Sequence, residues 1–247
     1  MMREWIYGRN PVYEVLRAGR RQVFRLLVVE GAQRKGQLAN ILELCDKKKI
    51  PVEYAPRTYL DRLQPGNQGL LLEASAYPYV TLHDIFELSE KRGESPLILV
   101  LDTLKDPQNL GTLLRTAEIV GAHGVFLPLR RTATITPAVV NASSGASEHL
   151  LVTQTNLAQA IKTLKEQDVW VIGLDSGPDA QLLDKKALRG PLALVIGAEG
   201  QGIRPLVRES CDHLLHLPMR GNIESLNAAV AGSIALYLAW EVRGFNQ

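Results

Sequence analysis

The feature that most constrains the fold is a regular alternation of short β-rich runs and longer helical patterns from Pro96 onward. The β-rich runs occupy residues 97–102, 124–129, 149–155, 169–175, 192–197 and 213–219. The helical patterns occupy residues 109–122, 156–167 and 225–243. This alternation is typical of βα units, which form a mostly parallel sheet covered by helices. The sequence therefore predicts an α/β fold with ligands at the carboxyl ends of its strands.

Residues 1–76 predict a smaller, separate α/β unit. Helical patterns near 11–19 and 36–49 alternate with strand patterns at 25–31, 51–55 and 69–75. Prolines and charged residues then gather in 77–95 around one short helical piece. We therefore predict an N-terminal domain over 1–76, a linker over 77–95 and a second domain over 96–247.

Composition excludes several classes of protein. The 247 residues are 46% hydrophobic and 22% charged, which is typical of a soluble globular chain. No apolar run reaches the roughly 18 residues of a membrane span, and the first residues lack the apolar segment of a secretory signal. We expect a cytoplasmic protein with no membrane partner. Cys45 and Cys211 have neither zinc-site spacing nor a pair of histidines nearby, so we expect buried free thiols and no metal.

Positive charge is concentrated at the N-terminal end of the chain. Residues 1–76 hold 13 Lys and Arg against 8 Asp and Glu, whereas the whole chain has a net charge of only +2. Basic clusters often form nothing more than a solvated face, but they also fit binding to nucleic-acid phosphates. The candidate nucleic-acid-binding residues are Arg9, Arg17, Arg20 and Arg21.

Three loops at predicted strand ends carry candidate functional residues. The first follows the run at 97–102 and leads into a helical pattern. Asn109 is placed to cap this helix, and Arg115 lies six residues further on among apolar residues. Six residues do not stack on one helical face, yet folding of the loop can bring both side chains to one ligand. The alternative is an ordinary surface arginine on an amphipathic helix.

The second loop, IGAEGQGIRP, places Glu199 among Gly197, Gly200 and Gly202. Its spacing matches neither the dinucleotide-binding GxGxxG pattern nor the GxxxxGK[ST] pattern of phosphate-binding loops. The glycines permit close approach of the backbone to a ligand, and they fit a plain tight turn equally well.

The third loop, LPMRGNIESLN, opens the C-terminal helical pattern. Leu217 and Met219 are apolar, whereas Ser225 and Asn227 offer polar atoms on either side of Leu226. An apolar slot with a few polar contacts suits an adenosine-containing ligand. Helix capping by Ser225 or Asn227 is the simpler interpretation.

Together, in this order, the three loops resemble the motifs of the SpoU/TrmH family of RNA ribose 2′-O-methyltransferases. NLGTLLRTA is similar to the first motif, IGAEGQGIRP to the second and LPMRGNIESLNAAVAG to the third. Residues 1–76 resemble the small substrate-binding domain of the subgroup that methylates a guanosine of bacterial 23S rRNA. YGRNPVYEVL is similar to the opening of that subgroup.

The resemblance implies a SPOUT-type fold with a C-terminal trefoil knot, a homodimer and S-adenosyl-L-methionine as cofactor. It places the cofactor against Gly197, Leu217, Met219 and Leu226, and it implies a catalytic set of Asn109, Arg115, Glu199, Ser225 and Asn227. Because a guanidinium is a poor proton acceptor, we expect Arg115 to act on the phosphate beside the target ribose.

The resemblance leaves the RNA substrate open. The implied partner is 23S rRNA or a ribosomal assembly intermediate. The alternatives are a family member acting on a tRNA loop nucleotide and an inactive homologue that only binds RNA. The intact motif residues argue against inactivity, and the N-terminal domain argues against the tRNA alternative.

Overall fold

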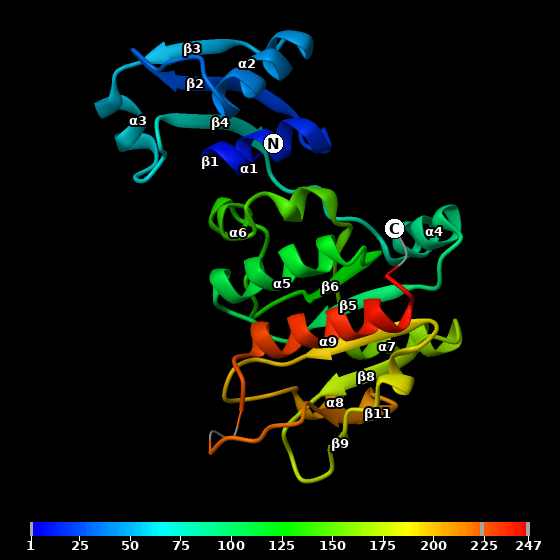
Figure 1. The fold of residues 1–247 in the computed structure, drawn as a ribbon. Coiled ribbons are helices and arrows are strands. Elements are labelled where there is room, and N and C mark those ends of the chain that lie inside the picture. The colour runs from blue at the N-terminus through cyan, green and yellow to red at the C-terminus, as the bar shows by residue number, and fades with distance from the viewer. Residues whose placement is uncertain (1, 223–224, 246–247) are drawn as a thin grey trace. The chain divides into compact units, whose positions relative to one another are not determined.

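The computed structural model describes residues 2–222 and 225–245, which form two compact units (Figure 1). Unit 1 comprises Met1–Pro78 together with Ile135–His149. Unit 2 comprises Tyr79–Thr134 and Leu150–Gln247. The residues 135–149, which the sequence-based division puts in the second domain, therefore pack in unit 1. Residues 79–95 pack in unit 2, where α4 (Leu82–Arg92) has a Thr81–Asp84 capping box and buries Ile85.

Unit 1 is built on a four-stranded sheet of order β1-β4-β2-β3. β4 is antiparallel to both β1 and β2, and β3 is parallel to β2. The strands are β1 (Arg3–Tyr7), β2 (Val23–Val29), β3 (Val52–Ala55) and β4 (Leu70–Ser75). The helices between them are α1 (Arg9–Ala18), α2 (Gln37–Lys47) and α3 (Arg57–Leu63). Gly19 caps the C-terminus of α1, and its φ of 64° lies in the left-handed region that glycine tolerates.

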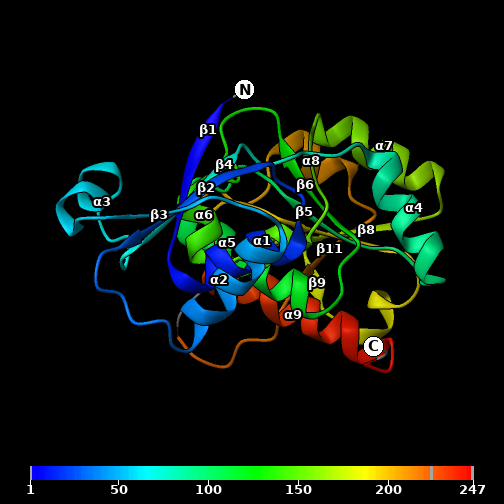
Figure 2. The ribbon, with the colours of Figure 1, turned by 90° about the horizontal axis from the view of Figure 1, so that it is seen from above.

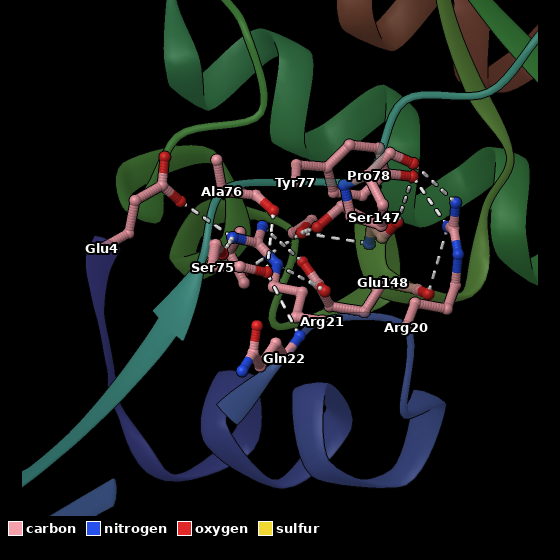
Figure 3. Close-up of polar contacts among 12 residues, drawn as sticks. Glu4, Arg20, Arg21, Gln22, Ser75, Ala76, Tyr77, Pro78, Ser147 and Glu148 are labelled. Carbon is pink, nitrogen blue, oxygen red and sulfur yellow. Dashed lines mark hydrogen bonds and ion pairs between the residues drawn. The ribbon is translucent and has the colours of Figure 1, made fainter. Parts of the chain in front are cut away.

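A buried arginine connects the early strands of unit 1 to its late segment, which contains α6 (Pro137–Ala142) and the short helix η1 (Ala146–His149). Arg21 Nε and Nη2 donate to the two carboxylate oxygens of Glu148, each at 2.9 Å (Figure 3). Arg21 Nη1 donates to Glu4 at 2.8 Å and to the carbonyl of Ser75 at 3.0 Å. Burial alone would lower the pKa of Arg21, but its bonds to Glu148 and Glu4 outweigh burial and raise it.

Unit 2 contains the predicted parallel sheet, so this prediction is confirmed. All its strand pairs are parallel, in the order β7-β6-β5-β10-β8-β11-β9. The strands are β5 (Leu97–Leu101), β6 (Gly124–Pro128), β7 (Val152–Thr155), β8 (Trp170–Leu174), β9 (Gln181–Leu182), β10 (Leu192–Ile196) and β11 (His213–His216). β5, β6 and β10 are buried at every position, which explains their continuous apolar sequences. The trefoil knot stays a prediction.

Helices cover both faces of this sheet (Figure 2). α4, α7 (Leu157–Glu166) and α8 (Pro205–Ser210) share one core with β5, β6, β8 and β10. α5 (Pro107–Ile119) and α9 (Ala228–Val242) pack together on the opposite face. Gly232 permits their close approach, because a Cβ there would meet Leu113 at 2.6 Å. No helix in the described part of the chain is long and apolar enough to span a membrane.

Candidate active site

The carboxyl ends of β8, β10 and β11 surround a pocket of about 850 Å³ in unit 2. These strands are neighbours in one parallel sheet, so the loops that follow them meet at the same edge. The pocket wall includes seven of the predicted site residues, namely Gly197, Glu199, Leu217, Met219, Ser225, Leu226 and Asn227. The loops after β10 and β11, which carry the second and third motifs, thus line one pocket although they are separated in sequence.

The glycine-rich loop after β10 folds tightly back on itself. Ala198 and Gly202 exchange backbone hydrogen bonds of 3.0 and 2.8 Å. A Cβ on Gly197 would lie 2.1 Å from the carbonyl carbon of Gly202, so only glycine fits there. Gly200 has a φ of 72° with open space around it. The loop is therefore a tight turn and also part of the pocket wall. The prediction of a plain turn and the prediction of a ligand-contacting loop are compatible.

An ion pair between a buried aspartate and a partly exposed arginine ties this loop to the neighbouring strand. Asp102, which directly follows β5, is fully buried. Arg204 donates to its carboxylate from the backbone N at 2.8 Å and from Nε at 2.7 Å. Neither Asp102 nor Arg204 is among the predicted site residues. The sequence features that could have indicated the pair are an aspartate at the end of an apolar strand and an arginine just before Pro205, the first residue of α8.

Asn227 brings the three motifs together. Its Oδ1 accepts hydrogen bonds from the backbone of Ala229 and Val230, at 2.9 and 3.1 Å, and so caps α9. This bonding orients the amide and turns Nδ2 away from the helix. Nδ2 donates to Oδ1 of Asn109 at 3.1 Å and to the carboxylate of Glu199. One side chain therefore caps α9 and also bonds to the first and second motifs.

The first motif contributes Asn109 and Arg115 from α5. The expectation that Asn109 caps this helix is wrong, because Asp106 is the cap and its carboxylate accepts from the backbone of Gln108 and Asn109. The side chain of Asn109 is thereby available to Asn227. Arg115 lies on the exposed side of α5, about 9 Å further along the helix axis. Neither Asn109 nor Arg115 belongs to the pocket wall.

The remaining wall of the pocket combines apolar groups with one further carboxylate. Leu217 is buried, whereas Met219 and Leu226 are 45% and 43% exposed and leave an apolar rim open to a ligand. Asp175, which follows β8, accepts from Arg208 Nε at 2.6 Å and from the backbone of Gly177 at 3.1 Å. Burial alone would raise the pKa of Asp175, but these bonds outweigh it and the pKa is lowered. The pair is a second feature that the sequence analysis missed.

The four arginines predicted to bind RNA divide into two groups. Arg9 and Arg17 are exposed on α1, where Arg17 contacts Glu14 at 3.3 Å. Arg20 donates to the hydroxyl of Tyr77 at 2.9 Å and to the carbonyl of Pro78 at 3.1 Å.

Arg21 requires a correction, because its side chain is 0% exposed and bonded to Glu4 and Glu148 (Figure 3). A guanidinium enclosed in this way has no surface to offer to a phosphate. Its role is therefore structural. Arg20, largely occupied within unit 1, is also a weak candidate.

The titratable groups around the site do not form a metal centre. Within residues 2–222 and 225–245, no three His, Cys, Asp or Glu side chains gather as metal ligands. Cys45 is buried and Cys211 is half-buried, and burial raises their pKa values to about 11 and about 12. Both thiols are therefore protonated at neutral pH.

Comparison with known proteins gives independent evidence. Residues 96–237 match the SpoU rRNA Methylase family, and residues 5–80 match the RNA 2′-O ribose methyltransferase substrate binding family. YacO of Bacillus subtilis, assigned to the TrmH family of tRNA/rRNA methyltransferases, is 41% identical over 97% of this chain and 96% of its own. The 23S rRNA (guanosine-2′-O-)-methyltransferase RlmB of Pseudomonas putida is 39% identical over 96% and 95%.

A solved structure supports the fold. The SpoU methyltransferase AviRb from Streptomyces viridochromogenes, in complex with the cofactor AdoMet, superposes with a TM-score of 0.80 at 22% identity. The superposition covers 99% of this chain and 92% of AviRb. The family resemblance found in the sequence is confirmed by the two family matches and the full-length relatives. The chain therefore belongs to the SpoU rRNA methylase family.

Proposed function

We propose that this protein transfers a methyl group from S-adenosyl-L-methionine to the ribose 2′-hydroxyl of a guanosine in 23S rRNA. The observation that carries the proposal is the junction of Asn109, Glu199 and Asn227 at the edge of the pocket. Three separate motifs have to fold together to form it. A structural cap alone would need only the Oδ1 of Asn227.

The pocket fits the proposed cofactor in size and in chemistry. A volume of about 850 Å³ lies within the range of small-molecule sites, and its wall combines glycine and apolar residues with several polar side chains. Because Gly197 has no side chain, a ligand can approach the backbone there closely. Leu217 and Leu226 offer apolar contact to an adenine ring. The carboxylates of Asp175 and Glu199 lie in the same wall and suit a ligand with positive charge and hydroxyl groups. When bound, the cofactor supplies an electrophilic methyl group on a sulfonium.

The side chains of the protein would act by positioning the acceptor ribose. Asn227 fixes Asn109 and Glu199 through its amide, so that their remaining polar atoms are held at one place. Orientation of this kind can supply roughly 7–11 kcal/mol of rate acceleration. Arg115 is proposed to hold the phosphate beside the target ribose, since the planar guanidinium can donate two hydrogen bonds to phosphate oxygens. Ser225 lies in the pocket wall and offers a hydroxyl to the same region.

The choice of 23S rRNA rests on the relative RlmB and on unit 1. RlmB aligns over nearly the whole of this chain, including the segment that matches the substrate-binding family. Arg9 and Arg17 are the exposed arginines proposed to contact RNA in unit 1. A tRNA loop remains the second candidate, because YacO carries the broader tRNA/rRNA designation.

The proposed assembly is a homodimer, and the exposed face of α9 is the surface for it. Val230, Ile234 and Tyr237 are 45%, 39% and 44% exposed and follow the i, i+4, i+7 spacing of one helical face. The opposite side of α9 is buried against α5. A second copy of this chain covering the exposed face would remove these apolar groups from water.

The test is methyl transfer from radiolabelled S-adenosylmethionine to unmodified transcripts of 23S rRNA and of tRNA, with a ribosomal assembly intermediate as a third substrate. We expect label in 23S rRNA or in the intermediate, mapped to one guanosine ribose, and equal activity after treatment with a chelator. Label in tRNA alone would select the second candidate. Cofactor binding without transfer to any of the three would indicate an inactive homologue.

A further inference from the structure

Three exposed cations lie on the loops that follow β5 and β6, at the end of the sheet that contains the pocket. Lys105 belongs to the β5 loop, and Arg130 and Arg131 belong to the β6 loop. All three are exposed, and within the described ranges none of them makes an ion pair or a side-chain hydrogen bond. β6, β5 and β10 are consecutive in the sheet, so their loops share the edge that contains the pocket.

The two loops are joined to each other and to the site. Thr132 Oγ1 and the backbone N of Ala133 both donate to the carbonyl of Leu104, at 2.9 and 2.7 Å. On its other side, the β5 loop is joined to the glycine-rich loop through Asp102 and Arg204. The cations are therefore attached to the same framework that holds Glu199. Their placement is built into the fold.

The carboxylates of the β5 loop, Asp102 and Asp106, already have hydrogen-bond partners. The carboxylate of Asp102 is buried under Arg204, and that of Asp106 caps α5.

We propose that Lys105, Arg130 and Arg131 form a cationic rim that binds the phosphate backbone of the substrate RNA next to the target nucleotide. The inference rests on the proposed function and adds to it a path for the RNA from the pocket across the β5 and β6 loops. Arginine forks and a lysine ammonium both bind phosphate oxygens, and such contacts orient RNA without reading its sequence. The rim would thus determine the affinity for RNA and the position of the RNA along the protein. The residues joined by Asn227 would position the reacting ribose.

The test compares the full-length protein with the double variant Arg130→Ala and Arg131→Ala, using a 23S rRNA transcript. We expect the KM for RNA to rise about tenfold or more, with kcat at saturating RNA changed less than about twofold. In a plot of the logarithm of the RNA association constant against the logarithm of salt concentration, loss of two phosphate contacts should make the negative slope shallower by about 1.4 to 1.8. The Kd for S-adenosylmethionine should not change. Arg130→Lys with Arg131→Lys should keep most of the salt slope, because the charge remains.

Lys186→Ala with Arg189→Ala is the matched control. It also removes two exposed cations, but from the segment before β10, at the opposite edge of the sheet. We expect its KM and salt slope to equal those of the unmodified protein. An active parent protein with unaltered values in the Arg130 and Arg131 variant would overturn the rim. A parent protein that transfers no methyl group to any RNA would instead overturn the proposed function.

Discussion

Asn227 performs two tasks with the two ends of one amide. Its oxygen caps α9, and its nitrogen joins Asn109 to Glu199. Asn227→Ser separates these tasks, because serine caps helices about as well as asparagine but is too short to replace the amide. We expect the free energy of unfolding in urea to change by less than about 0.5 kcal/mol. Methyl transfer should fall by roughly 10²-fold or more. Unchanged turnover would reduce Asn227 to a cap.

Gly197 is defined by the space around it. Gly197→Ala places a Cβ 2.1 Å from a backbone carbon of Gly202, so the loop has to open and the pocket wall has to move. We expect cofactor binding, measured by calorimetry, to fall below detection. Gly200→Ala is the control: it has a positive φ but no neighbour within 4 Å, so it should cost about 1–2 kcal/mol of stability and retain binding. Equal binding by both variants would contradict the proposed cofactor site.

Arg115 is proposed to act on RNA and not on the cofactor. Arg115→Ala should leave the Kd for S-adenosylmethionine nearly unchanged and lower methyl transfer by about 10²–10³-fold, corresponding to roughly 2–4 kcal/mol. Arg115→Lys keeps the charge without the planar fork. Partial recovery of the rate by lysine supports phosphate neutralisation, and no recovery supports bidentate contact. Normal turnover by the alanine variant would remove Arg115 from the site.

At the scale of elements, α9 presents different chemistry on its two sides. Small residues let α5 approach closely, whereas Val230, Ile234 and Tyr237 remain exposed. If a second copy covers that face, Ile234→Lys places a charge in an apolar interface. We expect sedimentation to shift from dimer to monomer, with helix content by circular dichroism unchanged. Thr112→Lys, at an exposed site on α5, is a further probe of how far the interface extends.

The elements of unit 2 were largely predictable from sequence because each has a strong local signal. Strands such as β5 and β10 are apolar throughout, and α9 has its cap directly before an apolar stretch. The site was partly predictable for the same reason, since its motifs follow strand ends. The cap of α5 was misassigned because Asp106 and Asn109 are both good capping residues, and only the backbone decides between them. The pairs Asp102–Arg204 and Asp175–Arg208 join residues far apart in sequence, which local patterns do not reveal.

At the scale of the whole chain, the order of residues does not match the order of compact units. Residues 135–149 follow a strand of unit 2 but pack in unit 1. Nothing in their local pattern predicts this, because their partners, such as Arg21 for Glu148, lie far away in the sequence. A chain beginning near Ser95 would retain Glu148 and lose its partner. Truncation is therefore a poor test of RNA binding by the N-terminal residues, and exposed Arg9 and Arg17 are better targets for substitution.

The Arg21–Glu148 pair gives a prediction about how unit 1 is held together. Arg21→Met leaves the carboxylate of Glu148, only 1% exposed, without its charged partner. Removing one partner of a buried pair commonly costs about 3–5 kcal/mol, whereas replacing both by apolar groups is often close to neutral. We therefore expect Arg21→Met to destabilise unit 1 strongly, and Arg21→Met with Glu148→Met to recover part of the loss, because Glu4 still lacks its partner.

Hydrogen exchange followed by mass spectrometry measures this directly, because amides of residues 135–149 and of β2 should lose protection together in the single variant. Arg17→Ala, which removes an exposed pair with Glu14, should change protection by less than about 1 kcal/mol. If Arg21→Met increases exchange in β2 but leaves residues 135–149 as protected as before, the late segment is held by other contacts. If the double variant is no more protected than the single one, packing around Arg21 matters more than its charge.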